Sequence, residues 1–244
     1  NEYEDDWLIG IPGEIEGEDY SWTKDPTVVT PMHWRADGSG EQESGENHIY
    51  VVSSEGGAAA KISSWGLDYQ GSLAWLDNNT LVLQGNDNLD DLQSPWKQTA
   101  VFTLGVDSKK ITRISPEGGV YNSPKPSPDG KIAFLGHPSK DYSYVALDIY
   151  LNDGKQTKKL TKDLSATPRE LFWLSEKELA FSIDDHGASK VKIVNISSEE
   201  LSEKIANFKE QFYLSSVYND DLFGTYSNSK RPSELAIIKN DEIK

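Results

Sequence analysis

The stretch that decides the fold is Ser127-Pro128-Asp129-Gly130-Lys131-Ile132-Ala133-Phe134. Its first half is a turn, because proline presets φ at the second position, aspartate hydrogen-bonds its local backbone and glycine closes the turn. Its second half opens the segment Lys131–Gly136, which is rich in residues that favour strands. A turn between two segments of this kind predicts a β-hairpin.

Similar apolar segments recur along the whole chain. Five of them lead into polar turns, and their first residues are 52, 48, 42 and 44 positions apart: Ile49–Val52, Val101–Leu104, Ile149–Leu151, Val191–Val194 and Leu235–Ile238. A second set alternates with the first at separations of 51, 47 and 43: Leu81–Leu83, Ile132–Phe134, Leu179–Phe181 and Leu222–Gly224. A constant offset of six residues joins Trp75 to Leu81, Pro126 to Ile132 and Trp173 to Leu179.

This periodicity predicts an all-β fold of the β-propeller type. Each repeat has room for about four short strands, and one four-stranded sheet cannot bury both faces alone, so neighbouring repeats must supply the core. We expect about five blades, near residues 28–64, 65–118, 119–163, 164–208 and 209–244. Residues 1–27 are expected to form a loop and the end of an earlier blade, and the whole chain is expected to be part of a larger ring of seven or eight blades.

One segment has a helical pattern. Ser197–Phe208 carries Leu201 and Ile205 one helical turn apart, which makes it the best helix candidate in the chain. However, it occupies the place that a turn and an outer strand take in the other repeats.

Composition excludes several classes of protein. The 244 residues include 24 basic and 40 acidic side chains, which give a net charge of −16, and no cysteine. Without cysteine there is no disulfide framework, no thiolate nucleophile and no Cys-ligated zinc. The negative charge disfavours binding to nucleic acid and to anionic membrane surfaces. The apolar runs are too short to span a bilayer. Compartment is not readable from the chain, although a cytoplasmic location is favoured.

The repeats resemble those of a known enzyme family. The block Ser127–Phe134, with Leu147–Leu151 and Lys159-Leu160-Thr161, resembles the propeller repeats of TolB-like proteins and of the prolyl oligopeptidase family. Asp25–Gly40, followed by His48–Val52, looks like a mid-propeller segment of the acylaminoacyl-peptidase branch, and Arg231–Ile238 looks like its final blade. The turn motif is degenerate in the second, fourth and fifth repeats.

The resemblance implies a function carried out together with another domain. In that family a Ser-His-Asp triad lies on an α/β-hydrolase domain, and the propeller restricts access to peptides. The motif Gly-x-Ser-x-Gly that marks this nucleophile is missing here, so no catalytic residue is transferred. We therefore expect a non-catalytic propeller portion, without cofactor, whose partners are peptide substrates and a hydrolase domain in cis. A free-standing TolB-like or WD40-like scaffold is the alternative.

Candidate site residues are few. The resemblance implies that Glu14 and Glu16 could anchor a peptide amino terminus, because one branch of the family does this with paired propeller carboxylates, and Arg231 could bind a substrate carboxylate. These residues are the substrate-steering candidates, although an exposed loop is the preferred interpretation of the two glutamates and a turn with Pro232 that of Arg231. The isolated histidines His33, His48, His137 and His186 are interpreted as ordinary sheet or turn positions. His186 beside Asp184 and Asp185 is the sharpest metal or acid–base candidate, and a polar hairpin turn is favoured there.

Two further patterns have structural interpretations. Asn86–Asp91 is acidic enough to suggest calcium, but it lacks the spacing and glycine of an EF-hand loop, so a solvated loop is favoured. Trp75 and Trp173 share a repeat position, which predicts that each packs between blades. Terminal blades of an incomplete ring would expose apolar faces, so we expect self-association or association with missing blades.

Overall fold

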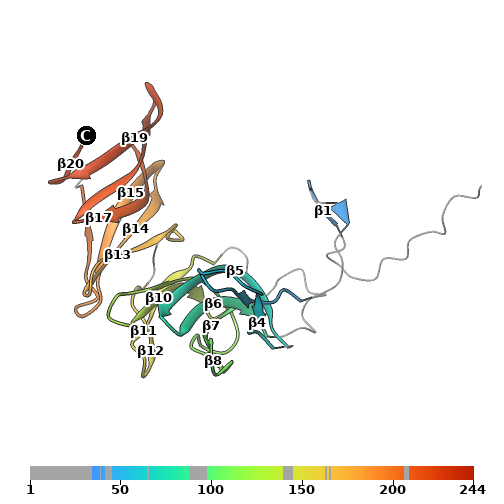
Figure 1. Cartoon of the computed structure of the whole chain (residues 1–244). Coiled ribbons are helices and arrows are strands. Elements are labelled where there is room, and N and C mark those ends of the chain that lie inside the picture. Colours follow the sequence, from blue (N-terminus) through green and yellow to red (C-terminus); the bar gives the residue numbers. More distant parts are fainter. Residues whose placement is uncertain are drawn as a thin grey trace, which may run out of the picture. The chain divides into compact units, whose positions relative to one another are not determined.

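The computed structural model describes residues 35–38, 40–41, 46–64, 66–87, 98–139, 145–162, 164, 166–205 and 209–244. Every helix or strand in these ranges is a β-strand (Figure 1), so the all-β prediction is confirmed. Two short pairs come first, β1 (Arg35–Ala36) with β2 (Gly40–Glu41) and β3 (Tyr50–Val51) with β4 (Ala60–Lys61). We call the second pair the leading hairpin.

Four groups of four consecutive antiparallel strands follow, and we call them modules 1 to 4. Modules 1 and 2 are separate four-stranded sheets, whereas modules 3 and 4 are joined into one eight-stranded sheet by a parallel pairing of Ser189 with Gln211. Module 1 consists of β5 (Asp68–Asp77), β6 (Thr80–Asn86), β7 (Ala100–Gly105) and β8 (Ile111–Arg113). Module 2 consists of β9 (Val120–Pro126), β10 (Ile132–His137), β11 (Asp148–Asn152) and β12 (Thr157–Lys159). Module 3 consists of β13 (Leu171–Ser175), β14 (Glu178–Asp185), β15 (Ala188–Asn195) and β16 (Leu201–Glu203). Module 4 consists of β17 (Gln211–Tyr218), β18 (Asp221–Asn228), β19 (Arg231–Lys239) and β20 (Glu242–Ile243). The number of blades in a complete ring, and the blade limits, stay predictions.

The six-residue offset in the sequence is the register of the first hairpin in modules 1, 2 and 3. Trp75 pairs with Leu81, Pro126 with Ile132 and Trp173 with Leu179. In module 2 the turn is closed by Ser127, whose hydroxyl accepts a hydrogen bond from Lys131 N at 2.8 Å. Gly130 has a φ of 86°, a conformation that side chains other than glycine rarely adopt.

Module 4 makes the same connection with a shorter turn. Tyr218 pairs with Asp221, which leaves only Asn219 and Asp220 between the strands. Both have positive φ, 46° and 64°, as a type I′ hairpin turn requires. The fifth repeat therefore joins its first two strands by a two-residue turn in place of the Ser-Pro-Asp-Gly turn.

A hydroxyl group recurs at the third strand of successive units. Ile49 N donates to Ser63 Oγ at 2.9 Å, Val101 N to Ser115 Oγ at 3.1 Å and Ile149 N to Thr161 Oγ1 at 2.9 Å. The three backbone donors are the first residues of three recurring apolar segments. The leading hairpin thus occupies the third-strand and fourth-strand positions of a unit that precedes module 1.

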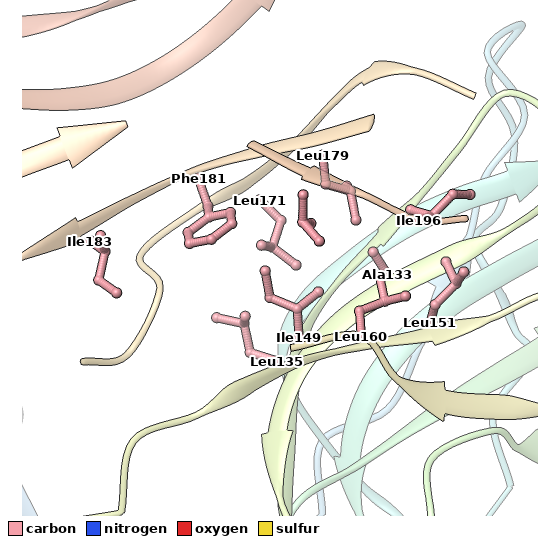
Figure 2. Close-up of a cluster of buried hydrophobic side chains, with 11 residues drawn as sticks. Ala133, Leu135, Ile149, Leu151, Leu160, Leu171, Leu179, Phe181, Ile183 and Ile196 are labelled. Carbon is pink, nitrogen blue, oxygen red and sulfur yellow. The ribbon is translucent and has the colours of Figure 1, made fainter. Parts of the chain in front are cut away.

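The hydrophobic core lies between modules rather than within them. Alternate residues of each second strand point to opposite faces, which we call upstream, toward the preceding unit, and downstream, toward the following one. In β14, Leu179 and Phe181 pack against module 2, whereas Ala180 packs against module 4. Figure 2 shows the interface of modules 2 and 3, where Phe181 and Leu179 lie over Ile149 and Leu160. Because every described interface is built in this way, no module has a core of its own.

Two sequence predictions need correction or refinement. The candidate helix does not form in its described part, because Leu201–Glu203 is β16 and pairs with β15, as the repeat position requires. Trp173 packs against the core of modules 2 and 3 as predicted, and its Nε1 donates to Lys125 O at 2.9 Å. Trp75 is 53% exposed, so the prediction that it is packed between blades is wrong. The leading hairpin covers Leu81 and Leu83 but not this side chain.

Candidate functional site

The segments that lead into the first strand of each module lie at one end of the modules. At each junction the start of a first strand is bonded to the start of the preceding third strand. The bonds are Asn47 N to Asp68 Oδ1 at 3.0 Å, Tyr121 N to Thr99 O at 2.9 Å, Leu147 N to Thr167 Oγ1 at 3.1 Å and Ser189 N to Glu210 O at 3.0 Å. The connections between second and third strands lie at this same end, which we call the loop end.

Charged groups of modules 3 and 4 meet at the loop end. Arg169 Nη2 lies 2.6 Å from Asp184 Oδ2, and its guanidinium carbon lies 4.6 Å from the centre of the Tyr213 ring. The Ser189 hydroxyl donates to the same carboxylate. The Ser189 hydroxyl and the Arg169 guanidinium together lower the pKa of Asp184, so this carboxylate is ionised at neutral pH. The cluster therefore holds one positive and one negative group of module 3, and the positive group lies over the Tyr213 ring of module 4.

A polar cavity of about 580 Å³ lies beside this cluster. Its lining carries hydroxyl, amide and charged groups from the start of β17 and from the β14–β15 and β18–β19 turns: Gly187, Lys209, Glu210, Gln211, Ser227, Asn228 and Ser229. The Glu210 carboxylate accepts hydrogen bonds from Tyr226 Oη at 2.5 Å and from Asn228 Nδ2 at 3.1 Å. Neutral donors hold this carboxylate, and they leave its negative charge available to a cationic ligand.

A second cavity of about 590 Å³ lies between modules 1 and 2. Arg113, Asn152 and Gln156 are among the residues that line it. The Thr157 hydroxyl, also in the lining, donates to Ile114 O at 2.6 Å and joins the two modules. The charged residues in this lining are Arg113, which is paired with Asp87 at 2.7 Å, and Lys155. The lining contains no carboxylate, so this cavity offers no anionic partner to a cationic ligand.

Among the described residues, the hydroxyl of Ser63 contacts a histidine ring, and this contact is structural. His48 Nδ1 lies 3.2 Å from Ser63 Oγ. That hydroxyl is buried and holds the backbone of Ile49, which is the role that Ser115 and Thr161 perform in modules 1 and 2. A hydroxyl that accepts a backbone hydrogen bond in this way joins two strands, and this role differs from that of an activated nucleophile.

The sequence candidates fall in different places. Arg231 begins β19 at the loop end, where it is exposed and lies 3.4 Å from Glu234 of its own strand. It therefore lies in a strand and not in the turn with Pro232 that the sequence favoured. Glu14 and Glu16 lie outside the described residues, as does His33. His186 occupies a hairpin turn with a φ of 50° and contacts Asp185, as favoured from the sequence.

The remaining candidates are explained by local structure. His137 is buried, and burial lowers the pKa of its ring below the usual value. In the acidic stretch Asn86–Asp91 only the first two residues are described, and Asp87 is paired with Arg113. Within the part of the chain that the structure describes, no three His, Asp or Glu side chains gather as a metal site. No helix among those residues is long and apolar enough to cross a membrane.

Sequence reasoning named Asp184 only as a neighbour of His186 and missed the other loop-end groups, Arg169, Glu210 and Tyr226. The four side chains come from four different strands or the segments that lead into them, and no local motif or periodic spacing joins them. The available signal was their position, since each lies next to the beginning or end of a strand that the repeat predicted.

Comparison with known proteins shows the fold. No protein-family model and no curated protein sequence matches this chain. Among solved structures, acylaminoacyl peptidase from Pyrococcus horikoshii matches 94% of this chain and 34% of its own, with a TM-score of 0.61 at 18% identity. Puromycin hydrolase matches 85% and 37%, with a TM-score of 0.64 at 12% identity. TolB from Acinetobacter baumannii matches 80% and 46%, with a TM-score of 0.50 at 16% identity.

This chain therefore spans less than half the length of each of these three proteins. The parts that match share the arrangement derived above, in which four-stranded antiparallel sheets pack face to face in sequence order. The fold of this chain is a β-propeller fold, of the type seen in the acylaminoacyl peptidase, puromycin hydrolase and TolB structures.

Proposed function

We propose that this chain is the non-catalytic propeller portion of a serine peptidase of the oligopeptidase or acylaminoacyl-peptidase type. In this role it admits peptides and steers them to a hydrolase domain that is not part of the chain. The observation that carries the proposal is the polar cavity at the loop end of modules 3 and 4. Its amides, hydroxyls and charges can pair with the backbone and termini of a peptide, which is rich in donors and acceptors.

The charge of the chain supports a preference among peptides. A net charge of −16 attracts cationic ligands over distances set by the ionic strength. At the cavity itself, Glu210 is held by Tyr226 and Asn228, which are neutral donors. A peptide with a free amino terminus or a basic first residue can therefore pair with this carboxylate.

Binding of labelled peptides tests this proposal. Two peptides of equal length, one with a lysine-rich and one with a glutamate-rich amino-terminal end, are titrated with the chain and followed by fluorescence anisotropy. We expect tighter binding of the lysine-rich peptide, weakened by added salt. Glu210→Gln should weaken it further, whereas Glu176→Gln removes the same charge from the β13–β14 turn at the other end of module 3 and should not. Equal binding of both peptides, or equal effects of both substitutions, would contradict the proposal.

Hydrolysis tests the non-catalytic part of the proposal separately. Peptide p-nitroanilides should remain intact in the presence of the chain. Turnover that a serine-directed inhibitor abolishes would show that the chain carries its own triad.

A free-standing TolB-like or WD40-like scaffold is the second candidate, and the match to TolB over 80% of this chain favours it. The encoding gene discriminates between the two. A reading frame that continues past Lys244 into a domain with Gly-x-Ser-x-Gly supports the peptidase. A scaffold is supported instead by a stop codon at that point together with specific binding of a folded protein.

A further inference from the structure

The cavity between modules 1 and 2 is lined by cations and neutral polar groups. Its volume is about 590 Å³, and Arg113 of β8 and Lys155 of the β11–β12 turn bring one positive charge to it from each module. The neutral polar residues of the lining are Thr103, Thr112, Ser115, Asn152, Gln156 and Thr157. Aspartate, glutamate and histidine are absent from the described residues that line it. The function proposed above makes no use of this cavity.

The segment that contains the cavity differs in charge from the rest of the chain. From the end of β7 to the end of β12, residues 105–159 contain nine Lys or Arg and six Asp or Glu side chains. The rest of the chain contains 15 and 34, respectively. The cavity therefore lies in a basic part of an acidic protein. An anion meets less repulsion there than at the loop end, where Glu210 lines the cavity.

Arg113 is held in position by three contacts. Its Nη1 donates to Asp87 Oδ2 at 2.7 Å, and its Nη2 donates to Pro116 O at 3.0 Å. Its guanidinium carbon lies 5.9 Å from the centre of the Phe102 ring. A guanidinium has five N–H donors, so these two hydrogen bonds leave one further N–H on each terminal nitrogen. A guanidinium fixed in this way can pair with the oxygens of a carboxylate or a phosphate.

The turn between β11 and β12 places the second cation. Asp153 Oδ1 accepts hydrogen bonds from the backbone nitrogens of Lys155 and Gln156, both at 2.9 Å. These bonds fix the shape of the turn, and the carboxylate that makes them does not line the cavity. The Lys155 side chain is exposed and forms no salt bridge with the residues that the structure describes. Its ammonium is therefore available to an anionic ligand.

We propose that this cavity binds a small molecule that carries two or more carboxylate or phosphate groups. Arg113 and Lys155 pair with the anionic oxygens, and the hydroxyls and amides of the lining donate hydrogen bonds to the others. The volume lies within the range of about 300–1,000 Å³ that is usual for small-molecule sites. Because the two cations belong to different modules, the ligand joins modules 1 and 2, as the hydrogen bond from Thr157 Oγ1 to Ile114 O already does.

Isothermal titration calorimetry with citrate and with pyrophosphate tests the proposal, and the two probes separate carboxylate from phosphate recognition. Sodium chloride keeps the ionic strength equal in all titrations. At least one anion should bind, with one site per chain. Lys155→Gln should weaken this binding by about tenfold or more, because it removes a cation from the lining. Binding of neither anion would overturn the proposal.

Two further substitutions locate the anion. Lys177→Gln removes the same charge from an exposed position in the β13–β14 turn and should change the affinity by less than about twofold. Lys209→Gln removes it from the cavity at the loop end. Equal losses in Lys155→Gln and Lys177→Gln, or a loss in Lys209→Gln alone, would overturn the proposal.

A substitution with the opposite expected effect tests the role of Arg113. Asp87→Asn removes the carboxylate that is paired with this guanidinium, so anion binding should become about threefold tighter or more. Glu176→Gln removes the same charge from the β13–β14 turn and should leave the affinity unchanged. A misfolded variant loses affinity, so a gain in affinity cannot come from misfolding. Weaker or unchanged binding to Asp87→Asn would contradict the proposed contact with Arg113.

Discussion

Ile149 and Leu235 occupy equivalent positions in the third strands of modules 2 and 4, yet the first is completely buried and the second is almost completely exposed. The sequence presents both as members of one repeating set. What distinguishes them is packing: module 3 covers Ile149, whereas no described residue covers Leu235.

This relationship predicts a large difference between two similar substitutions. Ile149→Ala should lower the free energy of unfolding by about 2–5 kcal/mol, because it removes a buried side chain and leaves a cavity. Leu235→Ala should change it by less than about 0.5 kcal/mol. Urea unfolding followed by tryptophan fluorescence measures both, and equal losses would show that the two positions are not in the environments described.

A second comparison concerns the two tryptophans at one repeat position. Trp173→Phe removes the hydrogen bond from the indole to Lys125 O and should cost about 0.5–1.5 kcal/mol, and more if the carbonyl is left buried without a donor. Trp75→Phe serves as the control, since that side chain is exposed and should tolerate the change within about 0.5 kcal/mol. Thermal unfolding checks both, and a larger loss from Trp75→Phe would contradict the structure.

The tight turn of module 4 can be improved. Asp220 has a φ of 64° at the second position of its turn, where glycine carries no steric penalty. Asp220→Gly should stabilise the chain by up to about 1 kcal/mol, measured as a higher midpoint of urea unfolding. A matched change at a position with ordinary φ, Asp221→Gly in β18, should destabilise it instead.

The buried His137 predicts a dependence of stability on pH. Burial lowers the pKa of its ring, and its Nδ1 accepts a hydrogen bond from Ser139 N at 3.2 Å, so the folded chain favours the neutral ring. The unfolded chain takes up the proton near the ordinary pKa of 6.5. Because the unfolded state then binds more protons, stability is fully present above that pKa and decreases as pH falls below it.

His137→Gln isolates this contribution from that of the carboxylates. Between neutral and mildly acidic pH, the free energy of unfolding should decrease less steeply in the variant than in the parent chain. Identical slopes would show that the ring is protonated equally in the folded and unfolded states.

The sequence by itself determined where the strands lie and which of them form hairpins. Segments such as Leu179–Phe181 and Val191–Val194 were predicted to be strands, and they lie in β14 and β15, because alternation, turn residues and a fixed offset are local signals. The same repeat predicted that the modules depend on their neighbours, since a sheet with two apolar faces cannot stand alone.

Only the tertiary structure decided which side chains at a repeated sequence position are buried by a neighbouring module. It also decided which turns lie close together at the loop end. Trp75 and Trp173 are equivalent in sequence, but Trp173 is hydrogen-bonded to Lys125 in the first strand of the preceding module, whereas Trp75 is 53% exposed. Likewise Glu210 and Tyr226 lie 16 positions apart and meet because β17 and β18 pair in one register. Burial and polar contacts depend on which modules pack side by side in space. A repeat in the sequence predicts that a position faces a neighbouring module, but it does not show whether a module covers that position.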